Sequence, residues 1–200
     1  MVKNLIFDFG QVLVHFDPDY MTGCYVEDKE DARLLKQVIF DRLYWDRLDK
    51  GTITDQEVLR QVKTRIPQRL HKAAEQIYNN WYYNIPEMEG MRELLSKMRA
   101  EYNVKTYILS DISRGFAEHA EEIEILHGFD GFCFSAVEGF CKPDPKAMEN
   151  LLNKFALSAE ESFFVDDKPA NIEGALKAGV NGFVFEGDAT ALEKKLIEIL

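Results

Sequence analysis

Cysteine, positive charge and long apolar runs are all scarce in this 200-residue sequence. The three cysteines (Cys24, Cys133 and Cys141) are an odd number and form no Cys-x-x-Cys pair, which argues against a disulfide framework and favours reduced thiols in a cytoplasmic protein. No apolar stretch approaches the roughly 18 residues of a membrane span. The apolar N-terminus is interrupted by Asp8 and lacks a signal-peptide pattern. We therefore expect no membrane association.

The charge balance excludes a second class of partner. With 24 Lys and Arg against 35 Asp and Glu, the formal net charge is -11. Such a chain is repelled by a phosphate backbone, so we expect no nucleic-acid partner, although a local basic pocket could hold a small anion. A hydrophobic fraction of 46% is ordinary for a globular chain and argues against disorder. No feature demands an obligate protein partner.

Short apolar runs rich in Val, Ile, Phe and Tyr predict buried parallel strands. The five runs are 4–9, 104–109, 132–135, 162–165 and 182–185. Amphipathic stretches alternate with the later runs and predict helices over 88–102, 146–155, 171–178 and 191–200. This alternation predicts an α/β fold, a Rossmann-like parallel sheet with helices on both faces.

Residues 17–85 break the alternation and are almost wholly helical in pattern. We expect helices over 31–48, 55–66 and 70–85, the second opened by a capping box of Thr54 and Glu57. The predicted organisation is a catalytic core of residues 1–16 and 86–200 with an all-helical cap inserted at 17–85. The alternative is that these helices simply pack on the sheet. The aromatic residues of the segment could stack on a sugar, but their helical spacing favours a core role; they are Tyr44, Trp45, Trp81, Tyr82 and Tyr83.

Polar residues stand where three of the apolar runs stop: Asp8, Ser110 and the pair Asp166 and Asp167. Ligands of open α/β sheets bind beyond the carboxyl ends of the strands, so these side chains should converge. Three carboxylates at one edge repel one another and are costly to desolvate unpaired. Mg²⁺, which prefers oxygen ligands, resolves this repulsion. Ser110 and Lys142 add a hydroxyl and a cation that could hold a phosphate.

In this order and spacing, four motifs resemble those of the haloacid dehalogenase superfamily of phosphohydrolases. The motifs are IFDFGQVL at 6–13, YILS at 107–110, GFCKPD at 139–144, and FFVDD at 163–167 followed by Asn171. The match spans nearly the full length, and WDRLDKGTI at 45–53 also resembles a segment of the helical caps in that family. The first motif is similar to the Asp-x-Gly-Asn-Val subgroup, which includes an α-glucose-1-phosphatase.

The resemblance implies a role for each motif residue. Asp8 is the implied nucleophile, which attacks phosphorus and forms an aspartyl-phosphate. Mg²⁺ is the implied cofactor, held by Asp8, the backbone carbonyl of Gly10, Asp167 and a phosphate oxygen, with Asp166 a ligand or its neighbour. The phosphate would lie among Ser110, Asp111 and Lys142, and Asn171 would orient the fourth motif. The implied substrate is a small phosphorylated metabolite, such as a sugar phosphate.

Two residues depart from the family pattern. Gly10 stands where most family phosphatases carry the aspartate that protonates the leaving oxygen, and such general acid catalysis contributes about 10²–10⁴ in rate. A substitute could come from His15, Asp17 or Asp19, from the cap, or from the substrate. Asp111 stands where many relatives carry asparagine; it is either that replacement acid or, as the sequence favours, a solvent-facing carboxylate.

These departures keep other functions open. A non-catalytic or regulatory member of the family would bind a phosphometabolite or a protein, and Gly10 and Asp111 motivate that alternative. A phosphotransferase or mutase would hand the aspartyl-phosphate to another acceptor. Dehalogenation is disfavoured, because family dehalogenases need no Mg²⁺ and do not usually carry the pair formed here by Asp166 and Asp167.

Overall fold

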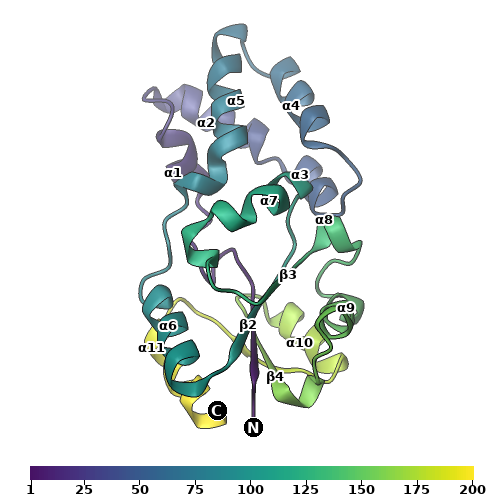
Figure 1. The fold of residues 1–200 in the computed structure, drawn as a ribbon. Helices are drawn as coiled ribbons and strands as arrows, with labels where there is room; N and C mark the ends of the chain where they lie inside the picture. Colours follow the sequence, from purple (N-terminus) through teal and green to yellow (C-terminus); the bar gives the residue numbers. More distant parts are fainter.

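The computed structural model describes residues 1–200 as a five-stranded sheet flanked by helices, with a further group of helices beyond one end of the sheet (Figure 1). The strand order is β3-β2-β1-β4-β5, and every neighbouring pair is parallel. The strands are β1 (Asn4–Phe7), β2 (Lys105–Ser110), β3 (Gly131–Phe134), β4 (Ser162–Asp166) and β5 (Asn181–Val184). All five predicted strands are confirmed, with ends displaced by one or two residues.

Two layers of helices cover the two faces of the sheet. Helices α6 and α11 lie on one face, and α9 and α10 lie on the other (Figure 1). Alternate residues of β1 serve the two layers: Leu5 and Phe7 pack toward α6 and α11, whereas Ile6 packs toward α9 and α10. The helices of the sheet region are α6 (Met91–Tyr102), α7 (Arg114–His119), α8 (Ser135–Glu138), α9 (Pro145–Phe155), α10 (Pro169–Lys177) and α11 (Ala189–Ile199).

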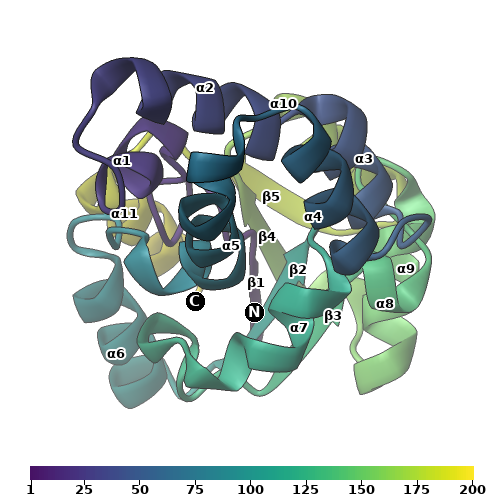
Figure 2. The same cartoon turned by 90° about the horizontal axis from the view of Figure 1, so that it is seen from above.

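Residues 17–85 form the group of helices beyond the sheet, seen from above in Figure 2, and we call them the helical segment. Its elements are α1 (Pro18–Gly23), α2 (Lys29–Ile39), α3 (Arg42–Asp49), α4 (Asp55–Thr64), η1 (Gln68–Leu70), α5 (His71–Asn80) and η2 (Trp81–Asn84). The segment has its own apolar cluster, which includes Leu35, Val58 and Ile77, all fully buried. It therefore packs as a layer of its own rather than lying flat on the sheet.

Two long helices predicted for this segment are wrong. The pattern over 31–48 is divided into α2 and α3, because the Asp41 side chain accepts a hydrogen bond from the Leu43 amide and starts a new helix. The pattern over 70–85 is divided into η1, α5 and η2. The short helices α1, α7 and α8 have too few turns to give a periodic signal and were not predicted. The capping box of Thr54 and Glu57 is confirmed.

The chain enters and leaves the helical segment through two segments that are hydrogen-bonded to each other. The His15 amide donates to the Pro86 carbonyl at 2.8 Å, and the Met88 amide donates to the Leu13 carbonyl at 2.8 Å. The helical segment also makes apolar contact with the sheet region beside these two segments, where Trp81 stacks on Phe116 with ring centroids 5.6 Å apart. The helical segment is therefore joined to the sheet region at one narrow place and packed against it beside that place.

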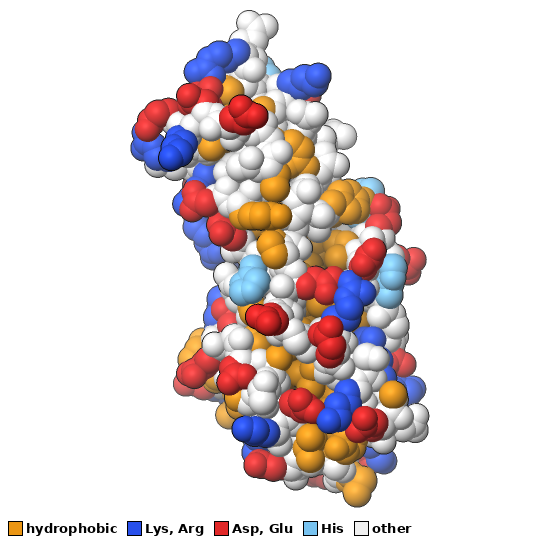
Figure 3. Space-filling view, turned by 90° about the vertical axis from the view of Figure 1, so that its left-hand side faces the viewer, with side chains coloured by type: hydrophobic (Ala, Val, Ile, Leu, Met, Phe, Trp, Pro, Cys, Tyr) orange, Lys and Arg blue, Asp and Glu red, His pale blue; other side chains and the backbone are white.

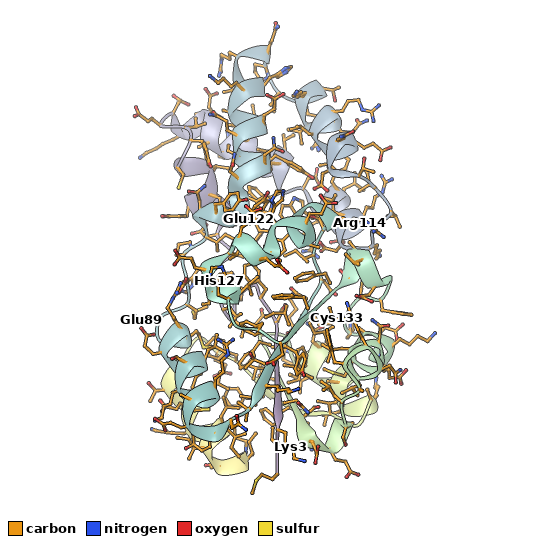
Figure 4. All side chains as sticks on the ribbon, viewed as in Figure 1. Lys3, Glu89, Arg114, Glu122, His127 and Cys133 are labelled. Atoms are coloured by element: carbon orange, nitrogen blue, oxygen red, sulfur yellow. The ribbon has the colours of Figure 1, made fainter.

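The surface carries mixed charges, and the three thiols are unpaired. On the face shown in Figure 3, acidic and basic side chains are interspersed, and no broad basic patch is visible. All three cysteines are free, and Cys133 is buried on β3 (Figure 4), where burial raises the pKa of its thiol to about 11. None of the helices combines the length and the apolar character needed to cross a bilayer.

Candidate functional site

The predicted site residues meet at the carboxyl ends of the three central strands. Asp8 follows β1, Ser110 ends β2 and Asp166 ends β4, and the order β2-β1-β4 makes these three ends neighbours. Lys142 reaches the same place from the loop between α8 and α9, and Asp167 follows β4. The convergence expected from the sequence is confirmed, because parallel strands bring all their carboxyl ends to one edge.

Asp8 is held by donors on one side only. Its Oδ1 accepts hydrogen bonds from the Phe9 amide at 2.7 Å and the Ser110 hydroxyl at 2.7 Å, and it lies 2.9 Å from the Lys142 ammonium. The residue is 6% exposed, and it lines a cavity. The other oxygen, Oδ2, accepts none of these bonds. The carboxylate is therefore fixed in orientation, with one oxygen outside these contacts.

Lys142 joins two buried carboxylates. Its ammonium lies 2.8 Å from Asp166 Oδ2, and its side chain is only 4% exposed. Burial by itself lowers the pKa of this lysine, but the charges of Asp8, Asp166 and Asp111 raise it above its ordinary value, so the ammonium stays charged. Asp166 also accepts from the Asn171 amide at 2.9 Å on each oxygen and from the Lys168 amide at 2.8 Å. Both Asp166 oxygens are thus already engaged.

The carboxylate of Asp167, unlike that of Asp166, has an oxygen without a partner. Its Oδ1 is buried and has no hydrogen-bond partner, and burial together with Asp8 and Asp166 raises the pKa of its carboxyl. One ligand atom from each of these three aspartates lies within 4.8 Å of the others. A buried oxygen without a partner beside two carboxylates is costly unless a cation binds. This donor set therefore fits a hard divalent cation such as Mg²⁺. Gly10, whose carbonyl accepts no backbone hydrogen bond, lines the same cavity.

Asp111 is not the solvent-facing carboxylate that the sequence favoured. The structure places it on the cavity wall, where its Oδ1 accepts from the Lys142 amide at 2.9 Å. Burial raises the pKa of this carboxyl, and the charge and the amide of Lys142 oppose that rise. Asp111 therefore orients the backbone at Lys142, a role that depends on a loop closing in space.

The cavity above these residues has a volume of about 210 Å³, and the helical segment contributes Arg42, Trp45, Asp49 and Trp81 to its lining. Its aromatic lining residues are Phe9, Phe16, Trp45 and Trp81. Tyr44, Tyr82 and Tyr83 do not line it. The charged residues that it exposes and that sequence reasoning did not select are Arg42, Asp49 and Lys168. The resemblance of 45–53 to a cap segment was the one signal that pointed toward Asp49.

The cavity does not include the acids suggested by proximity in sequence. Asp17 caps α1 by accepting from the amides of Asp19 and Tyr20, and Asp19 lies 2.5 Å from the Lys36 ammonium. His15 lies on a separate outer hollow. The three neighbours in sequence that were named as substitutes for the missing motif-one aspartate are therefore not placed to act on a ligand in the cavity.

Comparison with known proteins agrees with this geometry. The family model of the haloacid dehalogenase-like hydrolases matches residues 2–179. The chain is 27% identical over 196 residues to a sesquiterpene phosphatase of Aspergillus oryzae, covering 96% of this chain and 94% of that protein. It is 25% identical over 201 residues to a D-ribitol-5-phosphate phosphatase of Bacteroides thetaiotaomicron, covering 94% of each.

A solved structure shares the fold. It is the crystal structure of a haloacid dehalogenase family enzyme of Bacteroides thetaiotaomicron, in complex with magnesium and inorganic phosphate. The TM-score is 0.71 at 20% identity, and the match covers 96% of this chain and 99% of that one. Sheet order, motif positions and family match agree, and the chain belongs to the haloacid dehalogenase-like hydrolase family.

Proposed function

We propose that this chain is a Mg²⁺-dependent phosphatase that hydrolyses a small phosphate monoester through an aspartyl-phosphate on Asp8. The observation that carries the proposal is the one-sided bonding of Asp8. Oδ1 is held by three donors while Oδ2 is left unbonded in a residue that lines the cavity. The orphan oxygen of Asp167 beside it supports the metal requirement.

The residues of the site divide the chemistry between them. Asp8, Asp167 and the Gly10 carbonyl would hold Mg²⁺, which when bound would neutralise charge between the carboxylates and the substrate. Asp166 does not contact the metal or the substrate, because Lys142, Asn171 and the Lys168 amide already occupy its oxygens. Its role is to fix Lys142, not to contact substrate.

In the first step Asp8 Oδ2 attacks phosphorus, and the ester oxygen departs. Lys142 has three N–H donors, of which Asp8 and Asp166 use two, so one remains for a phosphoryl oxygen. The Ser110 hydroxyl has a single proton, which it donates to Asp8, so it must turn to the phosphoryl group when substrate binds. Water then attacks phosphorus and releases phosphate from Asp8.

The helical segment, residues 17–85, acts in this proposal as the cap that selects the leaving group. The cavity of about 210 Å³ suits a small metabolite. Its aromatic wall favours a leaving group with an apolar or ring-shaped face, which a sugar shares with other cyclic alcohols. The first motif resembles that of a subgroup with sugar-phosphate phosphatases. A sugar phosphate therefore stays a prediction within the wider class of phosphate esters of cyclic alcohols.

The test is phosphate release from p-nitrophenyl phosphate and from a panel of sugar and polyol phosphates, each with Mg²⁺ or with EDTA. We expect release that requires Mg²⁺ and is lost in Asp8→Asn, a variant of nearly equal volume. Lys3→Gln, at a surface ion pair far from the cavity, is the matched control and should keep full activity. Folded protein that releases no phosphate from any substrate would replace the proposal with a binding or regulatory role.

A further inference from the structure

The phosphatase reaction needs a proton donor that the first motif does not supply. At Gly10 an added Cβ would meet only the Phe16 Cβ, at 3.9 Å, so the position has space but carries no acid. An alkoxide leaving group is poor without a proton, and the second step needs a base to activate water. The group must therefore come from elsewhere in the cavity.

Four carboxylates line the cavity: Asp8, Asp49, Asp111 and Asp167. Three of them already have roles. Asp8 is the nucleophile, Asp167 belongs to the cation site, and Asp111 is bonded to the Lys142 amide. The Asp49 carboxyl has no hydrogen-bond partner in the protein, so it is free to exchange a proton with a ligand.

Asp49 is placed by tight docking of the last turn of α3 on α8. Its backbone carbonyl accepts from the Ser135 hydroxyl at 2.6 Å and from the Cys141 thiol at 3.6 Å. Two residues on, Gly51 has φ of +64°, and a Cβ there would lie 2.7 Å from the Ala136 carbonyl oxygen. The turn is therefore fixed against the sheet region, and Asp49 lines the cavity from the helical segment.

The position of Asp49 matches the geometry of in-line displacement. Asp8 lies at the carboxyl end of β1, and the helical segment lies beyond the carboxyl ends of the strands (Figure 1). In an in-line reaction the leaving oxygen departs on the side of phosphorus away from the nucleophile. A phosphate seated on Asp8 thus directs its leaving oxygen toward the helical segment, which supplies Asp49.

The surroundings of Asp49 allow both protonation states near neutral pH. Burial, then Asp111, then Asp46 raise the pKa of this carboxyl, whereas Arg42 and Lys168 lower it; the result is about 7. The Cys141 thiol also lies within reach of its charge. A group that both gives and takes a proton works best with a pKa near the operating pH.

We propose that Asp49 is the general acid and base of this phosphatase and replaces the aspartate missing at Gly10. The assignment rests on the proposed phosphatase function. In the first step the Asp49 carboxyl donates its proton to the leaving oxygen, as the Asp8–phosphorus bond forms and the phosphorus–ester oxygen bond breaks. In the second step the Asp49 carboxylate takes a proton from water, as the water oxygen bonds to phosphorus and the Asp8–phosphorus bond breaks.

The experiment compares Asp49→Asn with the wild type on two substrates at saturating Mg²⁺. One is an alkyl phosphate from the panel that the wild type hydrolyses, whose alkoxide needs a proton; the other is p-nitrophenyl phosphate, whose phenolate does not. For the variant we expect kcat on the alkyl phosphate to fall roughly 10²–10⁴-fold. On p-nitrophenyl phosphate we expect a burst of about one p-nitrophenol per enzyme followed by slow turnover, because only the water step still needs the base.

Controls separate chemistry from folding. Glu30→Gln removes the same charge from the helical segment, at an exposed pair with Arg33 away from the cavity lining, and should keep kcat within threefold. Asp49→Glu should recover part of the lost turnover. Circular dichroism and thermal melting establish that each variant is folded. The pH profile of kcat for the wild type should have a limb near neutrality, and the profile of Asp49→Asn should lack it.

Each other outcome overturns the assignment. If Asp49→Asn hydrolyses the alkyl phosphate within threefold of the wild type, the acid lies elsewhere. If only KM rises while kcat is kept, Asp49 binds the substrate and does not transfer a proton. A wild type with no Mg²⁺-dependent release on either substrate would refute the phosphatase function itself, which distinguishes that failure from failure of Asp49.

Discussion

Replacing Lys142 by methionine should destabilise the metal-free protein strongly. The change keeps the apolar stem but removes the one cation between Asp8 and Asp166, whose side chains are 8% and 0% exposed. Breaking a buried ion pair by removing one partner costs about 3–5 kcal/mol, because the remaining charge is left uncompensated. For a chain of this length each kcal/mol shifts Tm by roughly 2–4 °C. The expected fall in Tm is therefore roughly 6–20 °C.

The assay is thermal and urea unfolding of wild type and Lys142→Met in EDTA and in Mg²⁺. A cation bound to the native state stabilises it by about 2.7 kcal/mol at a concentration of 100 Kd. We expect Mg²⁺ to stabilise Lys142→Met more than the wild type, because the variant presents a net charge more negative by one beside Asp167. Activity should be lost in both conditions, since the contact with the phosphoryl group is gone.

The matched control is Lys168→Met, which removes the same charge at the cavity rim. Lys168 is exposed and its ammonium forms no ion pair, so its replacement should change stability by less than about 0.5 kcal/mol. The reasoning is refuted if Lys142→Met costs less than about 1 kcal/mol in EDTA. That result would mean that the carboxylates around Lys142 are neutral or solvated rather than compensated by it.

Three further substitutions test the residues in and beside the cavity. The folded-state pKa of Asp49 is raised from 3.8 to about 7, so its contribution to stability is full below pH 4 and is lost as the pH rises through 7. Asp49→Asn should therefore gain about 2–4 kcal/mol over the wild type between pH 4 and pH 8 in urea unfolding. Gly51→Ala should lower Tm and kcat together, because a positive φ and a backbone carbonyl oppose its Cβ, whereas Gly23→Ala, with nothing within 4 Å, should be neutral. Asn171→Ala removes a donor shared by both oxygens of Asp166 and should cost about 1–3 kcal/mol in the same unfolding assay and lower kcat.

The sheet and its polar edge could be predicted because their signals are local. A run such as 5–7 is apolar at every position, which is typical of a strand buried on both faces, and Asp8 marks its end. Parallel pairing then brings Asp8, Ser110 and Asp166 together without further information. The same logic fails inside the helical segment, where α2 and α3 share one amphipathic pattern and a single capping aspartate, Asp41, divides them.

The remaining site residues depend on contacts between distant parts of the chain. Asp111 is a wall residue only because the loop at Lys142 closes onto it, a separation of 31 residues. Asp49 lines the cavity because Ser135 fixes its turn from 86 residues away. Periodicity and motif spacing carry no trace of such contacts. A motif departure such as Gly10 shows that a function is missing, but not where its replacement lies.

The narrow junction of the helical segment has a consequence for how substrate preference can change. The amide of His15 bonds the carbonyl of Pro86, so the chain returns to within one hydrogen bond of where it departed. Changing the length of such a loop changes its closure entropy little, since that cost grows only with the logarithm of length. We therefore expect insertions, deletions or exchange within the segment to leave the carboxyl ends of the strands intact. A replacement must still cover Phe116 with an apolar side chain, as Trp81 does. Under the proposed role of Asp49, it must also carry its own acid at that place. Specificity and proton transfer would then be inherited together, separately from the nucleophile.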